Sequence, residues 1–81
     1  MREVKVDIAK VYVPMARRKS LDPARVAALA EDILENGQQA PILVRPDAER
    51  LVLVEGLHRL EACRALGDDT VVALMVQARR A

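Results

Sequence analysis

The chain has almost no aromatic side chains: Tyr12 is its one aromatic residue, and it contains neither phenylalanine nor tryptophan. This excludes a platform of aromatic rings on which nucleic-acid bases stack. Hydrophobic residues still make up 52% of the 81 positions. The core must therefore be built from valine, leucine, isoleucine, alanine and methionine.

Cysteine is also scarce, since Cys63 stands alone. A single cysteine forms no disulfide within the chain and provides none of the paired spacings of a zinc site. We therefore expect a reducing compartment, and the sequence predicts no metal site of this kind.

Long apolar runs are missing as well. The amino terminus carries Arg2, Glu3 and Lys5 where a signal peptide needs apolar residues. No later window approaches the run of about eighteen apolar residues that marks a membrane helix. The sequence thus predicts a cytoplasmic protein without membrane contact.

Neither sign of charge dominates, because thirteen basic residues stand against twelve acidic ones and the formal net charge is +1. No overall field attracts the chain to DNA or to an anionic membrane, so any basic binding surface must be local. A chain of 81 residues buries one modest core and has no room for a second. We therefore predict one domain that spans residues 1–81.

The first half of the chain predicts a strand and a helix. Apolar residues alternate over residues 4–13, which predicts a strand that bends near residues 9–10. Asp22 followed by Pro23 is typical of a helix start, and an apolar stripe at helical spacing then predicts a helix over residues 23–36.

The second half predicts a hairpin, a helix and a strand. Apolar runs at residues 42–45 and 51–54 enclose a turn-forming segment. A helix over residues 57–66 and a strand over residues 71–76 follow, and we expect residues 77–81 to be a solvated tail. The order of elements predicts an α/β (α+β) domain, with a small mixed sheet of about four strands and two covering helices.

One glycine separates the hairpin from the second helix, in the order Glu55, Gly56, Leu57, His58, Arg59. The first amides of a helix lack partners within it, and the helix dipole adds partial positive charge there. Glycine lets a ligand approach the main chain, while an imidazole and a guanidinium supply further donors. The combination is typical of a site for phosphate oxygens.

A purely structural interpretation of the same residues stays open. Gly56 can be a tight turn alone, with His58 and Arg59 on the solvent face of an ordinary amphipathic helix, because so short a pattern often occurs by chance. Two cationic side chains in the first turn nevertheless oppose the helix dipole, and a bound anion would remove that unfavourable term.

Two segments carry a family resemblance. Residues 21–26 are similar to the sulfiredoxin sequence Leu-Asp-Pro-Ala-Lys-Val, and residues 56–59 to the sulfiredoxin motif Gly-Cys-His-Arg, which is Gly-Glu-Arg-Arg in ParB proteins. The chain thus resembles the amino-terminal domain shared by ParB partition proteins and sulfiredoxins, over nearly its whole length. The resemblance implies a ParB/sulfiredoxin-like fold that binds the phosphates of CTP or ATP/ADP, with Mg²⁺. The residues that it implies for the phosphates are Arg25, Gly56, Leu57, His58 and Arg59.

The decisive departure from the family pattern is at the catalytic position. Leu57 stands where sulfiredoxins have their catalytic cysteine, and a leucine neither attacks nor accepts a phosphoryl group. Cys63 lies six residues further along, well over one helical turn away. We therefore expect no sulfinic acid reductase activity, and Cys63 is predicted to be a small buried apolar residue.

Two other function classes stay open. ADP-dependent serine kinases of this fold have an Asp-Gly-His-His-Arg motif, to which residues 55–59 are similar, so Glu55 could be the catalytic carboxylate of a small-molecule kinase rather than a strand-end group facing water. Arg17, Arg18 and Lys19 could contact DNA phosphates in an accessory protein, or simply form a solvated loop. The sequence also leaves open which base is bound, whether the nucleotide is slowly hydrolysed, and whether a free strand edge pairs with a second copy.

Overall fold

The computed structural model describes residues 2–76, so the predicted tail at residues 77–81 lies outside the described residues. Within residues 2–76, no helix combines the length and the apolar character needed to cross a bilayer. The elements, in chain order, are β1 (Glu3–Asp7), a 3₁₀ helix (Ile8–Lys10), β2 (Val11–Tyr12), α1 (Met15–Arg18), α2 (Pro23–Asn36), β3 (Ile42–Asp47), β4 (Arg50–Glu55), α3 (Leu57–Ala65) and β5 (Thr70–Met75).

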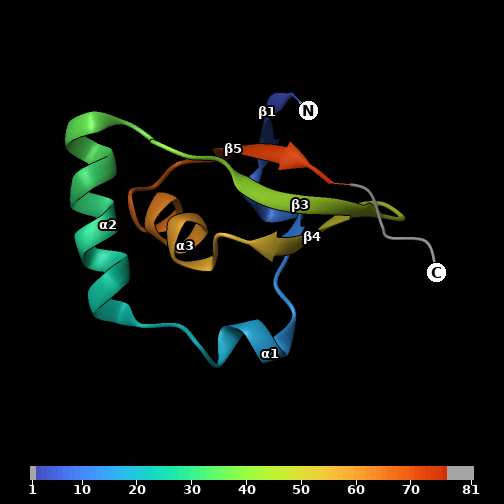
Figure 1. Ribbon diagram of the computed structural model, residues 1–81, viewed down its shortest axis with the longest axis horizontal. Coiled ribbons are helices and arrows are strands. Elements are labelled where there is room, and N and C mark those ends of the chain that lie inside the picture. The colour runs from blue at the N-terminus through green and yellow to red at the C-terminus, as the bar shows by residue number, and fades with distance from the viewer. Residues whose placement is uncertain (1, 77–81) are drawn as a thin grey trace.

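The strands form one mixed sheet in the order β1-β5-β3-β4-β2 (Figure 1). β1 pairs with β5, and β3 with β4, in antiparallel register. β3 and β5 are parallel, as are β2 and β4. The predicted α/β class with a mixed sheet is confirmed, but the sheet has five strands instead of about four, because residues 4–13 form two strands.

The sheet is curled, because its two edge strands are close neighbours in the sequence. β1 ends at Asp7 and β2 begins at Val11, and four residues span at most about 14 Å. Across a flat sheet, four inter-strand spacings would amount to about 19 Å. The 3₁₀ helix between the edges buries Ile8, whose amide donates to the Asp69 carbonyl at 2.9 Å.

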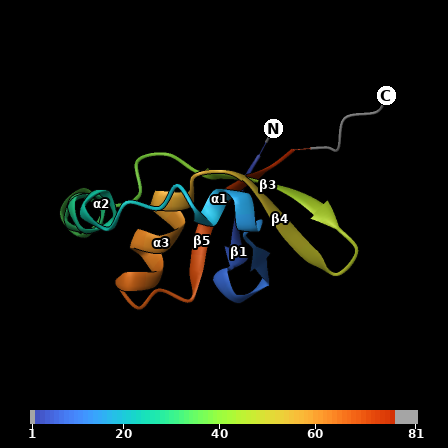
Figure 2. The ribbon, with the colours of Figure 1, turned by 90° about the horizontal axis from the view of Figure 1, so that it is seen from below.

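The two longer helices form successive layers outside the sheet, first α3 and then α2. α3 packs on β3 and β5, and α2 packs on α3 (Figure 2). The two predicted helices therefore do not cover the sheet equally, because α3 separates α2 from the strands. A third helix, the four-residue α1, replaces the loop expected at residues 16–20, and it buries none of its residues.

Local signals fix both ends of α2. The Asp22 carboxylate accepts a hydrogen bond from the Ala24 amide at 3.0 Å, which caps the first turn. Gly37 has φ 77° and donates its amide to the Ile33 carbonyl at 2.7 Å, which ends the helix. The predicted helix over residues 23–36 is confirmed at both boundaries.

The hairpin is longer than predicted. β3 continues through Pro46, which pairs with Leu51, so that Ala48 and Glu49 alone form the turn. Ala48 has φ 55°, a conformation that a two-residue hairpin turn requires and that alanine rarely adopts.

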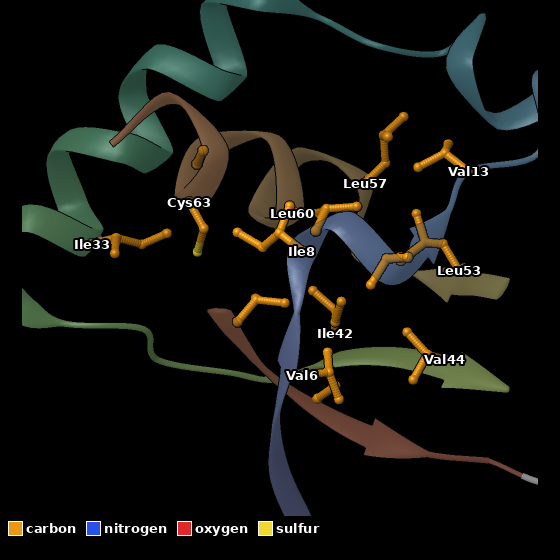
Figure 3. Packing of buried hydrophobic residues seen from close by; sticks show 14 residues of the cluster. Val6, Ile8, Val13, Ile33, Ile42, Val44, Leu53, Leu57, Leu60 and Cys63 are labelled. Atoms are coloured by element: carbon orange, nitrogen blue, oxygen red, sulfur yellow. The ribbon is translucent and has the colours of Figure 1, made fainter. Parts of the chain in front are cut away.

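A core of aliphatic side chains fills the space between α3 and the curled sheet (Figure 3). Leu57, Leu60 and Cys63 of α3 all belong to it. Ile42 and Leu60 have no exposed surface at all. The core thereby fixes the start of α3 against β3, which is where the candidate site lies.

Candidate phosphate-binding cleft

The start of α3 leaves three amides without partners inside the helix. The first intrahelical hydrogen bond runs from the Leu60 amide to the Gly56 carbonyl at 2.8 Å, so the amides of residues 57–59 have no acceptor within α3. Gly56 is the N-terminal cap and supplies no side chain to satisfy them. This helix end therefore presents free donors together with the positive end of the helix dipole.

Gly56 is required by both conformation and space. It adopts φ 105° and ψ 30°, in the left-handed region. A Cβ atom at this position would lie 2.7 Å from Ile42 Cγ2 and 3.1 Å from Ile42 Cα. The glycine thus lets α3 begin in direct contact with the buried strand β3.

Leu57 contributes an amide to the turn but not its side chain. That side chain is buried in the core beside Val13 (Figure 3). It also lies between two hollows, because it lines both the cleft at the start of α3 and a smaller cavity beneath α1. At the position of the sulfiredoxin cysteine, this chain therefore has an inward-facing structural residue.

His58 joins the starts of the two long helices. Its Nε2 accepts a hydrogen bond from the Asp22 amide at 3.0 Å, and Asp22 is the N-terminal cap of α2. A neutral imidazole that accepts at Nε2 has its proton on Nδ1. While this bond is made, Nδ1 is the atom of His58 that has a hydrogen to donate.

Arg59 has an unsatisfied polar atom. Its Nε is buried and has no hydrogen-bond partner among the described residues. None of the ion pairs within residues 2–76 involves Arg59 or Arg25. Buried polar groups almost always have a partner, so the Nε of Arg59 is an unusual donor that the described residues leave unsatisfied.

These groups open into one cleft of about 780 Å³, enclosed by α1, α2 and the start of α3. Figure 1 shows the three helices that contribute residues to its lining. Four of its residues are the predicted phosphate contacts Gly56, Leu57, His58 and Arg59, and a fifth predicted contact, Arg25, faces them from α2. The structure thus brings together residues that lie about thirty positions apart in the sequence. The remaining lining residues are Arg17, Ser20, Ala28, Leu29, Asp32 and Glu55.

The basic triplet, Arg17, Arg18 and Lys19, lies in and directly after α1, and its side chains take different directions. Arg17 lines the cleft. Arg18 faces the other way, since its Nε donates to the Val13 carbonyl at 3.1 Å and its side chain lines the smaller cavity. Lys19 is exposed and lines none of the cavities described here. The three residues therefore do not form one continuous patch.

Glu55 is the exposed last residue of β4 and lies at the edge of the cleft. Among residues 2–76, no three histidine, cysteine or carboxylate side chains come together as a metal site. Mg²⁺ is commonly held by one or two carboxylates together with substrate phosphates. Glu55, next to the phosphate turn, is a carboxylate that suits such an arrangement beside a bound polyphosphate.

Cys63 lies outside the cleft, in the core, and is 1% exposed. Burial raises the pKa of the Cys63 thiol above its ordinary value of 9.0, the charge of Asp68 raises it further, and Arg59 opposes the shift. A thiolate is therefore disfavoured at this position. The prediction of a small buried apolar residue is consistent with this environment.

Sequence reasoning did not place Arg17 or Asp32 at this site. Asp32 follows Arg25 by seven residues, which puts both on the same face of a helix, so that spacing was the available signal. Arg17 had no comparable signal, because α1 is too short to leave a periodic pattern.

Comparison with known proteins bears on the family and the fold. Residues 1–81 match the family described as the ParB N-terminal domain. Stage 0 sporulation protein J of Bacillus subtilis (strain 168) is 34% identical over 62 residues, which cover 76% of this chain and 22% of that protein. The chain thus spans about a fifth of the length of this relative.

Two solved structures share the fold. Sulfiredoxin from Arabidopsis thaliana has a TM-score of 0.86 and 28% identity, over 96% of this chain and 88% of the sulfiredoxin chain. The C-terminally truncated chromosome-partitioning protein ParB from Caulobacter crescentus, complexed with CTP-γ-S, has a TM-score of 0.83 and 24% identity. That match covers 98% of this chain and 46% of the ParB chain.

Proposed function

The chain belongs to the ParB N-terminal domain family, and from this premise we propose that it binds the phosphates of a nucleotide, CTP or ATP/ADP, in the cleft at the start of α3. The observation that carries the proposal is the unsatisfied Nε of Arg59 beside three helix-start amides. A phosphate group offers several oxygens and satisfies such donors together. The similar ParB from Caulobacter crescentus was solved with CTP-γ-S, which supports a nucleotide as the ligand class.

Each side of the cleft has a distinct role in this proposal. The amides of residues 57–59 and the guanidinium of Arg59 hold phosphate oxygens on the α3 side. His58 donates from Nδ1, because its Nε2 is bonded to the Asp22 amide. Arg25 and Arg17 approach from α2 and α1 and balance the remaining phosphate charge. Glu55 is available to hold Mg²⁺ against the phosphates.

Isothermal titration with CTP, ATP and ADP in the presence of Mg²⁺ tests the proposal. We expect binding of at least one of them, and we expect Arg59→Ala to weaken it by about tenfold to a hundredfold, since a hydrogen bond to a charged group is lost. Arg50→Ala is the matched control, because Arg50 stacks on Tyr12 at 4.1 Å and pairs with Asp47, outside the cleft. Absence of heat with all three nucleotides at high protein concentration would contradict the proposal.

DNA contact through the basic triplet is the competing proposal, and the exposure of α1 supports it. If it holds, replacing Arg17, Arg18 and Lys19 by alanine abolishes DNA binding while Arg59→Ala spares it. The DNA affinity would also fall steeply with salt, because counterions are released on binding. Nucleotide binding instead predicts that Arg59→Ala weakens CTP or ATP binding more than the triple replacement does, since the triple replacement removes a single cleft arginine, Arg17.

A phosphotransferase with Glu55 as its catalytic carboxylate is a narrower form of the nucleotide proposal. The position of Glu55 in the cleft, beside the phosphate turn, supports it. Glu55→Gln should then abolish phosphate release or phosphoserine formation and leave nucleotide affinity nearly unchanged. Glu49→Gln, in the hairpin turn, is the matched control. Loss of affinity together with turnover would instead indicate a binding role for Glu55.

A further inference from the structure

The cleft changes in chemical character along α2. Arg25, Ala28, Leu29 and Asp32 all line it, at spacings of three and four residues that place them on one face of the helix. From Arg25 to Asp32 the helix rises by about 10.5 Å. This is the scale of a nucleotide measured from its phosphates to the far edge of its base.

The cationic end of this stripe lies near the phosphate turn. Arg25 is in the first turn of α2, and the cap of that turn, Asp22, is bonded to His58 of α3. Asp32 lies two turns further from this contact. A polyphosphate is attracted to the arginine end and repelled by the carboxylate end, which orients a nucleotide along the helix.

The exposed Asp32 carboxylate makes one hydrogen bond and has acceptor capacity to spare. Its Oδ1 accepts a hydrogen bond from Asn36 Nδ2 at 2.9 Å, one turn further along α2. No cationic side chain of the described residues lies within ion-pair distance of it. The carboxylate is therefore an exposed acceptor at the end of the cleft away from the phosphate turn.

The middle of the stripe is apolar. Ala28 and Leu29 form the wall between Arg25 and Asp32. The one aromatic ring, Tyr12, is covered by Arg50 and lines none of this cleft. A flat ring bound here would lie against the aliphatic groups of Ala28 and Leu29.

We propose that Asp32 determines base specificity: its carboxylate accepts a hydrogen bond from the exocyclic amino group of cytosine or adenine. The inference rests on the proposed nucleotide function and adds a specificity residue to it. A carboxylate pairs with an amino donor, as aspartate and glutamate do with the cytosine amino group in DNA. An oxo group at the same position would place acceptor against acceptor. Asn36 acts as the positioning residue that holds the carboxylate.

Titration with nucleotides that differ by this one group tests the proposal. The pairs are CTP against UTP and ATP against ITP, and tripolyphosphate serves as a ligand without a base. The wild-type chain should prefer the amino member of at least one pair by about tenfold. Asp32→Ala should remove that preference, and Asp32→Asn should remove or invert it, because its amide can donate to an oxo group. Tripolyphosphate affinity should stay within about twofold, or rise slightly as a negative charge is removed.

Glu31→Gln is the matched control, since Glu31 is an exposed neighbour on α2 outside the cleft lining. It should leave every preference unchanged. Equal wild-type affinity within both pairs would overturn the inference. The inference would also be overturned if Asp32→Asn weakened the binding of both members of a pair equally and did so only when Mg²⁺ is present. That result would make Asp32 a metal ligand. Tripolyphosphate binding that depends on Arg59 would still support the proposed function in either case, whereas no binding of any of these ligands would overturn both.

Discussion

Gly56 determines how closely the phosphate turn approaches the core. Its left-handed conformation and its contact with Ile42 leave no space for a side chain. The turn is consequently set by the packing of α3 on β3 and not by flexible loop residues. Any residue larger than glycine must displace either the turn or the strand.

Gly56→Ala is expected to lower the free energy of unfolding by about 2–5 kcal/mol, the sum of left-handed strain and overpacking against Ile42. Gly67→Ala is the control, because Gly67 also has a positive φ, 82°, but has nothing within 4 Å of an added Cβ. It should show only the strain, about 1–2 kcal/mol. Urea denaturation measures both, and equal losses would show that the contact with Ile42 is easily relieved.

Cys63 gives a pH-dependent prediction at the same scale. Its folded-state pKa is raised above the ordinary value of 9.0, mainly by burial. The unfolded chain therefore loses the thiol proton first as pH rises, and stability that is complete below pH 9.0 declines above it. We expect the free energy of unfolding of the wild type to fall relative to Cys63→Ala as pH is raised through 9.0. Parallel curves for the two proteins would contradict a raised pKa.

The bond between His58 and the Asp22 amide couples two elements, α2 and α3, at the ends that face the cleft. The cap of one helix thereby depends on the first turn of the other. We therefore expect an anion bound at the start of α3 to change the environment of the Asp22 amide at the start of α2 through this hydrogen bond.

His58→Ala should remove the link, lower the free energy of unfolding by about 1 kcal/mol and speed hydrogen exchange at the Asp22 amide. Asn36→Ala is the control, since it removes one hydrogen bond at the opposite end of the same helix. Unchanged exchange at Asp22 in His58→Ala would mean that the bond has no effect in solution.

Elements with local signals were predictable from the sequence, and those defined by distant partners were not. The bounds of α2 followed from Asp22, Pro23 and Gly37, all of which lie within or beside the helix. The division of residues 4–13 into β1 and β2 could not be read from their alternation. It depends on pairing with β5 and β4, which lie far along the chain.

The candidate site shows the same difference. Residues 56–59 were found because a glycine between a strand and a helix is a local pattern. Arg17 lines the cleft only because the fold brings α1 near the start of α3, and Asp32 becomes a candidate site residue only through the cleft that it lines. A contact between residues far apart in the sequence gives no local sequence pattern from which it can be predicted.

At the scale of the whole molecule, β1 is the longer of the two edge strands in the sheet that residues 2–76 form, and an edge strand offers a second copy a place to pair. Glu3, Lys5 and Asp7 are exposed on this strand, and charged residues on an edge strand discourage such pairing. We therefore expect little self-association of the wild-type chain at moderate concentration.

Lys5→Val should increase self-association, measured by sedimentation velocity over a range of concentrations, because it removes the central charge of the edge. Lys19→Val, an equally drastic change at an exposed residue outside the sheet, should have no such effect. A wild-type chain that is already dimeric, and that Lys5→Val dissociates, would show that β1 charges stabilise an interface instead.

The most direct test of the central claim is a titration of the ¹⁵N-labelled chain with CTP, ATP and tripolyphosphate, followed through its amide resonances. Phosphate bound at the start of α3 should shift the amides of residues 57–59 most, with smaller shifts at the start of α2, and Arg59→Ala should reduce them all. Shifts centred on residues 17–19 without any at 57–59, or no shifts with any of the three ligands, would contradict the account.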